Sequence, residues 1–214
     1  MIPFFISELF VVRWPDAFAS EALPVNDPGL FRVSRYTAIW TLGYGLYRSY
    51  YAVGGTLGMP GIPVSIAEWR RINTIGAAML LATAVLPVVV VTAWGNRRAR
   101  PFLLVLSWVV TVGCVSHALI DIIQRIASLS GALTIPYPFW RTIDRRTADL
   151  QDLFFNEPWF LIEGLLWAAI AWAGTLRESP RRWWWVNTAA AATVASVTVG
   201  VLTAFGVIGR MIVG

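Results

Sequence analysis

The stretch Phe102–Ile123 reads FLLVLSWVVTVGCVSHALIDII, and Asp121 near its end is its only carboxylate or arginine. A helix needs about 20 mostly apolar residues to cross the hydrocarbon core of a bilayer. Membrane β-strands alternate apolar and polar residues, and this stretch does not. It therefore predicts a transmembrane helix and an all-α membrane protein.

Four other runs have the same character and complete the predicted architecture. They cover Tyr36–Val53, Asn73–Trp94, Pro158–Leu176 and Trp184–Val207. We expect a polytopic bundle of about five transmembrane helices over residues 36–214. Residues 1–35 are expected to form an N-terminal interfacial segment, because their apolar start lacks the basic beginning of a signal peptide.

The composition agrees with this class and excludes others. Hydrophobic residues make up 57% of the chain and charged residues 14%, whereas soluble domains carry about 25% charged residues. All seventeen basic residues are arginines that mostly flank the apolar runs, which favours topology signals over nucleic-acid binding. Cys114 is the only cysteine and His117 the only histidine, so we expect neither a metal site nor another cofactor.

Arginines near the helix ends predict the orientation. Nine lie on one side and six on the other, which favours an N-terminus inside and a C-terminus outside the bacterial cytoplasmic membrane. The first set is Arg13, Arg32, Arg35, Arg97, Arg98, Arg100, Arg177, Arg181 and Arg182, and the second is Arg70, Arg71, Arg141, Arg145, Arg146 and Arg210.

The connections carry signals of their own. Gly54–Pro63 is rich in Gly and Pro and predicts a turn or a re-entrant piece. Pro87 predicts a kink inside its helix, and Asn156-Glu157-Pro158 is typical of a helix start. The acidic residues Asp144, Asp149 and Asp152, with their neighbouring arginines, are expected to lie in a solvated loop.

Four ionisable side chains fall inside the predicted spans: Arg48, His117, Asp121 and Glu163. Such groups are costly in a membrane, so each is a functional-site hypothesis. At 1.5 Å per residue all four lie in the same half of the membrane. They would converge on one pocket if their three helices are neighbours.

Aromatic residues surround these groups at helical spacing. Tyr44, Tyr47 and Tyr51 share a helix face with Arg48. A second group, Trp159, Phe160 and Trp167, flanks Glu163, which would be poorly solvated there. The expected pocket therefore combines carboxyls, an imidazole and a guanidinium with aromatic rings.

Purely structural interpretations stay open for each group. Asp121 and Arg125 have the spacing of an ordinary ion pair, and Arg48 would pair with Glu163 in simple packing. His117 fits a hydrogen-bonded core residue, the tyrosines fit helix packing, and Glu163 fits a position facing interfacial water.

The segment Tyr50–Gly58, YYAVGGTLG, resembles the signature of a family of small bacterial membrane proteins of unknown function. That resemblance implies a membrane protein and no activity. A looser resemblance involves His117 and Asp121, four residues apart, with Glu163 on a later helix. They are similar to the His-x-x-x-Glu pair and the further glutamate of the emopamil-binding, sterol isomerase-like family. This resemblance, and one in size to bacterial membrane-bound terpene cyclases, implies alkene protonation and a carbocation.

The residues favour the same chemistry. We expect a membrane-embedded acid-initiated cyclase or isomerase acting on a terpenoid-like substrate. Glu163 or Asp121 would donate the proton, and His117 would tune Asp121 or accept the final proton. Arg48 would anchor a polar end of the substrate or balance a carboxylate, and the aromatic side chains would line the pocket.

The alternative is a non-enzymatic lipid-binding, transport or assembly subunit of a larger membrane complex. Either way, the expected partners are an apolar small molecule or lipid and the surrounding membrane lipids. The sequence is also compatible with a homo-oligomer.

Overall fold

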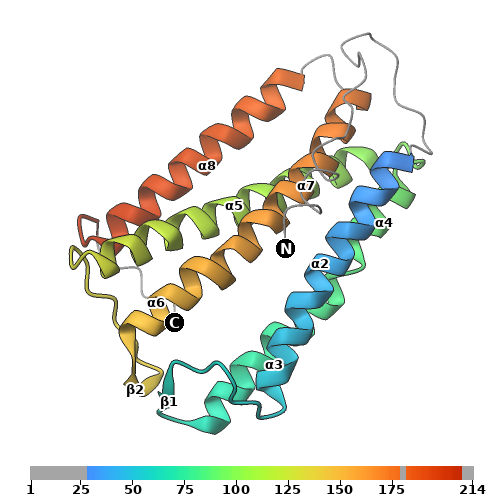
Figure 1. Ribbon diagram of the computed structural model, residues 1–214. Coiled ribbons are helices and arrows are strands. Elements are labelled where there is room, and N and C mark those ends of the chain that lie inside the picture. The colour runs from blue at the N-terminus through green and yellow to red at the C-terminus, as the bar shows by residue number, and fades with distance from the viewer. Residues whose placement is uncertain (1–27, 179–181, 209–214) are drawn as a thin grey trace, which may run out of the picture.

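The computed structural model describes residues 28–178 and 182–208, and most of this part is helical (Figure 1). The predicted all-α class is confirmed there, with a small two-stranded sheet added. The long helices are α2 (Pro28–Ala52), α3 (Ile66–Thr83), α4 (Leu86–Ala93), α5 (Arg100–Leu129), α7 (Glu157–Glu178) and α8 (Arg182–Ala204). Shorter elements are β1 (Gly61–Pro63), β2 (Trp140–Ile143), α6 (Arg145–Gln151) and a π-helical turn, η1 (Asp152–Asn156).

Within residues 28–178 and 182–208, four helical stretches are long and apolar enough to cross a membrane. They are Ile66–Ala93, Arg100–Leu129, Arg145–Leu176 and Arg182–Ala204, and each contains or overlaps one of the predicted spans. The remaining predicted span lies in α2, whose arginines and tyrosines make it less apolar. The predicted N-terminal segment lies mostly outside the described residues, and α2 already begins at Pro28.

The helices pack in two connected groups. α5 lies between α7 and α8, while α2 forms an antiparallel hairpin with α3 and also contacts α7 (Figure 1). Small residues allow the closest approaches: a Cβ on Gly164 of α7 would lie 3.1 Å from the backbone nitrogen of Val115 in α5. The largest buried side chains, including Trp94, Val90 and Ile170, gather where α4, α5 and α7 meet.

Pro87 divides the second predicted span, as expected. α3 ends at Thr83, and α4 begins at Leu86 with Pro87 in its first turn. Proline has no amide hydrogen to donate to the preceding turn, so a continuous helix cannot run through this point without distortion.

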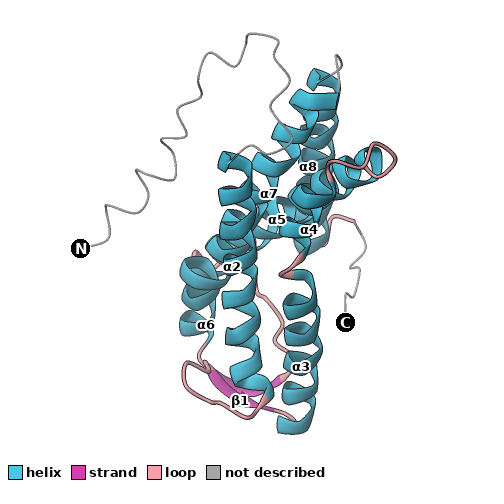
Figure 2. Cartoon of the chain, turned by 90° about the vertical axis from the view of Figure 1, so that its right-hand side faces the viewer, coloured by secondary structure: helices cyan, strands magenta, loops and turns pink. Residues whose placement is uncertain are grey.

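The Tyr50–Gly58 segment folds into a turn held by its own tyrosines. The phenol oxygen of Tyr50 accepts hydrogen bonds from the backbone N–H groups of Thr56 and Leu57, at 3.1 and 2.8 Å. Gly54 and Gly58 have φ values of 101° and 81°, which side-chain-bearing residues rarely adopt. The predicted turn is therefore present, but its continuation is a strand: β1 pairs antiparallel with β2 at this end of the molecule (Figure 2).

The expectation of a solvated acidic loop is wrong for residues 145–152, which form α6 and the start of η1. Asp144 caps α6 by accepting hydrogen bonds from the hydroxyl and the backbone N–H of Thr147, and these bonds hold the pKa of Asp144 below its usual range. Asp149 is only 2% exposed, because side chains from neighbouring segments bind both of its oxygens.

Candidate functional site

A cavity of about 460 Å³ lies between α2, α3, α5, η1 and α7. Most of its lining residues are polar or charged. The residues are Tyr44, Arg48, Gly76, Met79, Leu80, Thr83, His117, Asp121, Arg125, Asp152, Asn156, Glu157 and Phe160. The side chain of His117 is 49% exposed, so the cavity reaches the surface of the molecule beside it.

Three ionisable groups meet at one wall of this cavity. His117 and Asp121 lie one turn apart on α5, with 4.0 Å between Nε2 and Oδ2. The Oε2 atom of Glu157, at the start of α7, lies 3.8 Å from the same imidazole nitrogen. Glu157 is 3% exposed, and its Oε2 atom has no hydrogen-bond partner within the described part of the chain. This cluster offers a proton donor and acceptors at one point.

The packing of α5 against α7 explains why Glu157 is there. Gly164 lies level with Val115, and the two helices are antiparallel. Glu157 lies seven residues before Gly164, so it comes level with the residue after Asp121. The sequence alone gave Glu157 only the character of a helix start, because this register depends on the contact at Gly164.

A second network fixes the neighbouring wall. Arg125 forms ion pairs with Asp152 at 2.8 Å and with Asp149 at 3.3 Å. The expected ion pair between Arg125 and Asp121 is not among those formed within residues 28–176. Tyr137 donates a hydrogen bond to Asp149 at 2.6 Å, and burial together with this bond raises the pKa of Tyr137. Arg125 is thus held in place.

The π-helical turn η1 sets the positions of the acidic residues that precede α7. Asp152 and Asn156 are its first and last residues, both line the cavity, and the amide of Asn156 donates to Asp152 at 2.6 Å. Such turns occur frequently at functional sites because they shift side chains from the regular helical positions. The sequence carries no pattern that would have revealed this turn.

Two of the expected aromatic residues line the cavity. Phe160 packs edge-on against the imidazole of His117 with 4.5 Å between ring centroids, and it contacts Tyr44 at 5.3 Å. The phenol of Tyr44 donates to the amide oxygen of Asn156 at 3.4 Å. Arg48, which was also expected, lies one turn after Tyr44 on α2 and lines the same cavity.

Glu163 lies elsewhere, and the expected convergence of all four ionisable groups is therefore incomplete. It sits between α2 and α7, where its Oε1 atom accepts hydrogen bonds from Thr41 at 2.7 Å and from Trp167 at 2.9 Å. The cavity lining does not include it. The pairing of Arg48 with Glu163, left open above, is not among the ion pairs of residues 28–178.

The other aromatic residues mainly hold helices together. Trp159 stacks on Trp40 with 4.2 Å between ring centroids and donates to its carbonyl oxygen. Tyr47 and Tyr51 form a hydrogen-bonded chain from Gln151 to the turn at Leu57. The packing interpretation of the tyrosine stripe thus fits Tyr47 and Tyr51, while Tyr44 reaches the cavity.

The cluster of His117, Asp121 and Glu157 is also the group best placed to hold a metal ion among the described residues. One ligand atom from each lies within 4.8 Å of the others. One imidazole and two carboxylates suit a divalent cation such as Zn²⁺ or Mn²⁺. The sequence separated Glu157 from the pair by a long interval and gave no hint of this grouping.

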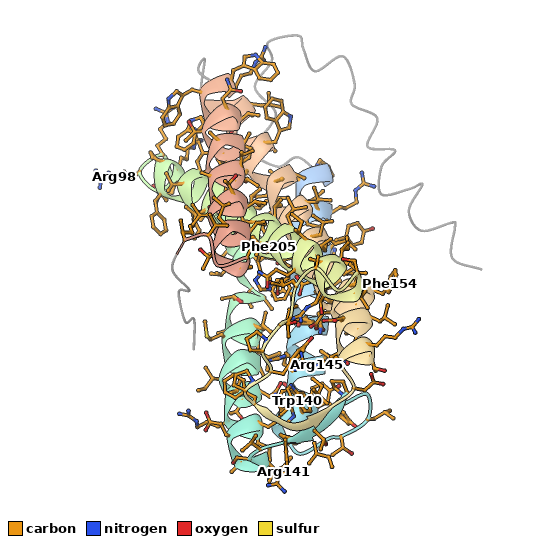
Figure 3. All side chains as sticks on the ribbon, turned by 90° about the vertical axis from the view of Figure 1, so that its left-hand side faces the viewer. Arg98, Trp140, Arg141, Arg145, Phe154 and Phe205 are labelled. Carbon is orange, nitrogen blue, oxygen red and sulfur yellow. The ribbon has the colours of Figure 1, made fainter. Side chains whose placement is uncertain are left out.

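Arg98 and Arg141, which the sequence assigns to opposite membrane faces, lie toward opposite ends of the molecule (Figure 3). No protein-family model matches the chain, and neither a curated protein nor a solved structure does.

Proposed function

We propose that the chain is a five-helix protein of the bacterial cytoplasmic membrane, with α2 as its first span, the N-terminus inside and the C-terminus outside. α2 supports this assignment because it packs along both α3 and α7, which themselves are apolar enough to cross. Its twenty-five residues are about 37 Å long, enough for the hydrocarbon core.

Within that bundle, the cavity is the active site of an acid-initiated isomerase or cyclase for a terpenoid-like substrate. The observation that carries this proposal is Glu157, a buried carboxyl with an unpartnered oxygen, beside a second carboxyl and an imidazole. Glu157 takes the role that the sequence offered to Glu163 or Asp121.

The reaction needs no oxidant or co-reactant. The carboxyl of Glu157 gives its proton to one carbon of an alkene, whose π electrons form the new C–H bond and leave a cation on the other carbon. In a cyclase, a second double bond attacks that cation. Loss of a proton from a neighbouring carbon to His117 or Asp121 restores a double bond, and the cluster returns the proton to Glu157. The product has the mass of the substrate.

The rest of the cavity suits a cation. Tyr44 and Phe160 offer aromatic faces, which stabilise a carbocation by cation–π attraction without forming a bond to it. Met79 and Leu80 supply an apolar wall for the hydrocarbon part of the substrate. Such walls also limit the water that would quench the cation.

The test is a product search with matched glutamate variants. Membranes containing the wild type, Glu157→Gln, Glu163→Gln or Glu68→Gln would be incubated with farnesylated and geranylgeranylated compounds. Chromatography with mass spectrometry would detect products of unchanged mass and shifted retention. We expect product from the wild type and from Glu68→Gln, whose exposed carboxylate pairs with Arg71 outside the cavity. Glu157→Gln should reduce the rate by a factor of about 10² or more.

The remaining outcomes are equally informative. Loss of activity in Glu163→Gln with retention in Glu157→Gln would return the acid role to Glu163. Absence of product from folded wild-type protein would reject the enzyme. Addition of EDTA tests the metal interpretation, because a proton-donating carboxyl works without a metal ion, whereas a metal-activated site would lose its activity.

A second candidate function, a lipid-binding or assembly subunit, is favoured by one observation. In the most apolar part of α8 only 6% of the residues are buried, and α8 packs mainly on α5. Its apolar face is open to lipid, a partner or a second copy of the chain. Native mass spectrometry of the purified protein would show the number of copies and any partner retained.

A further inference from the structure

Arg48 is the cavity cation that the protein itself does not neutralise. Over residues 28–176 and 182–208, no carboxylate oxygen lies within 4 Å of its guanidinium. Arg125, on another wall of the same cavity, has two carboxylate partners. The cavity carboxylates have other neighbours: Asp152 pairs with Arg125, and Asp121 and Glu157 lie beside His117.

Arg48 interacts with the phenol of Tyr44, one turn earlier on α2, but its position along α2 makes the lack of a carboxylate partner costly. A Cβ on Gly45 would lie 3.3 Å from the Cβ of Leu80, which sets the register of the antiparallel α2–α3 hairpin. Three residues further along α2, Arg48 comes level with Ala77, eleven residues into α3. That is about 16 Å from the beginning of α3, in the hydrocarbon region of a spanning bundle. Charges at such depth normally have a partner.

The cavity of about 460 Å³ beside Arg48 leaves room for that partner. Gly76 of α3 faces the guanidinium, and a Cβ added there would lie 3.6 Å from Nε of Arg48. Gly76, Met79, Leu80 and Thr83 follow one another at the spacing of a single helix face, and all four line the cavity. The cavity thus has a cationic end at Arg48 and an apolar wall running deeper along α3.

We infer that Arg48 binds the anionic head group of an amphiphile, a phosphate, diphosphate or carboxylate, whose apolar tail lies along Met79 and Leu80. A guanidinium donates two parallel hydrogen bonds to such groups and accepts none, so an anion suits it better than a neutral alcohol. This inference names the substrate class of the proposed active site and in that respect rests on the proposed function. The binding itself requires no turnover.

The experiment compares two ligands with the same tail. Full-length protein in phosphatidylcholine nanodiscs would be titrated with farnesyl phosphate and with farnesol, and bound ligand counted by native mass spectrometry. We expect farnesyl phosphate to bind at least tenfold more tightly than farnesol. Arg48→Gln should abolish the difference, Arg48→Lys should keep part of it, and Arg71→Gln, an exposed arginine outside the cavity, should keep all of it.

Competition identifies the source of the anion. Inorganic phosphate that displaces farnesyl phosphate would mark a site for a free anion, and displacement only by phosphatidylglycerol in the nanodisc would mark a lipid head group. Equal binding of both ligands by the wild type, or a preference that survives in folded Arg48→Gln, would overturn the inference. A preference without any isomeric product would reject the proposed enzyme and leave the anion site standing.

Discussion

The indole nitrogen of Trp167 and the hydroxyl of Thr41 both donate to the same oxygen of Glu163, so one buried acceptor joins α7 to α2. Glu163→Gln should leave the unfolding temperature almost unchanged, because an amide oxygen can accept both bonds. Thr41→Val should lower the free energy of unfolding by about 1–3 kcal/mol, since it takes one partner from a buried acceptor. Thermal unfolding of the purified variants checks both. A large loss in Glu163→Gln would show that the second oxygen has a role of its own.

Gly164 controls the approach of α7 to α5. A Cβ there would lie 2.7 Å from Cγ2 of Val115, so Gly164→Ala should cost about 1–3 kcal/mol by overpacking. Gly113, on α5, is the matched control, because a Cβ added to it would meet nothing within 4 Å. Gly113→Ala should be neutral or stabilising, since alanine favours helix. Equal effects of the two changes in reversible unfolding would disprove the close contact.

The hydroxyl of Tyr50 holds the turn before β1. Tyr50→Phe removes the acceptor for two backbone N–H groups and should destabilise this turn by about 1–2 kcal/mol. Hydrogen exchange should therefore speed up at Thr56 and Leu57. Tyr36→Phe, which alters an exposed tyrosine of the same helix, should leave the exchange rates as they are.

His117 and Glu157 should act as one unit in catalysis. If each single change, His117→Gln or Glu157→Gln, lowers kcat/KM by a factor of about 10²–10⁴, the double variant should be no more than slightly worse than either. The rate of isomeric product formation measures this. Multiplicative losses would show that the two residues act independently.

Alkaline pH should loosen the wall that holds Arg125. The pKa of Tyr137 is raised in the folded chain. The protonated phenol therefore contributes fully to the free energy of unfolding below the ordinary tyrosine pKa, and this contribution is lost as the pH rises through the raised value. The unfolding temperature should therefore fall as the pH rises above about 10. In Tyr137→Phe part of that fall should be missing. An unchanged pH profile in this variant would remove Tyr137 from the explanation.

The sequence was sufficient for the features that depend on long apolar runs. The spans around Phe102–Ile123 and the break at Pro87 follow from hydrophobicity and from the missing amide hydrogen, which are local properties. Tyr44, Arg48, His117, Asp121 and Phe160 were also found, because ionisable and aromatic groups at helical spacing are rare in a span.

The parts that the sequence could not provide depend on register between helices. Glu157 joins His117 only because Gly164 lets α7 lie at one particular height along α5. Glu163 has the same residue type and lies on the same helix, but it faces α2 and not the cavity. The burial of Asp149 likewise requires Ser128 and Tyr137, which are brought to it by the fold.

α8 contributes to none of the cavity walls, since every lining residue lies between positions 44 and 160. Its main support is one neighbour, α5, and most of its surface faces outward. The cavity is therefore formed by the preceding helices alone, and α8 packs outside it on α5. An engineer seeking to fuse a reporter, to graft a dimerising helix or to split the protein into two co-expressed fragments would place the junction just before α8.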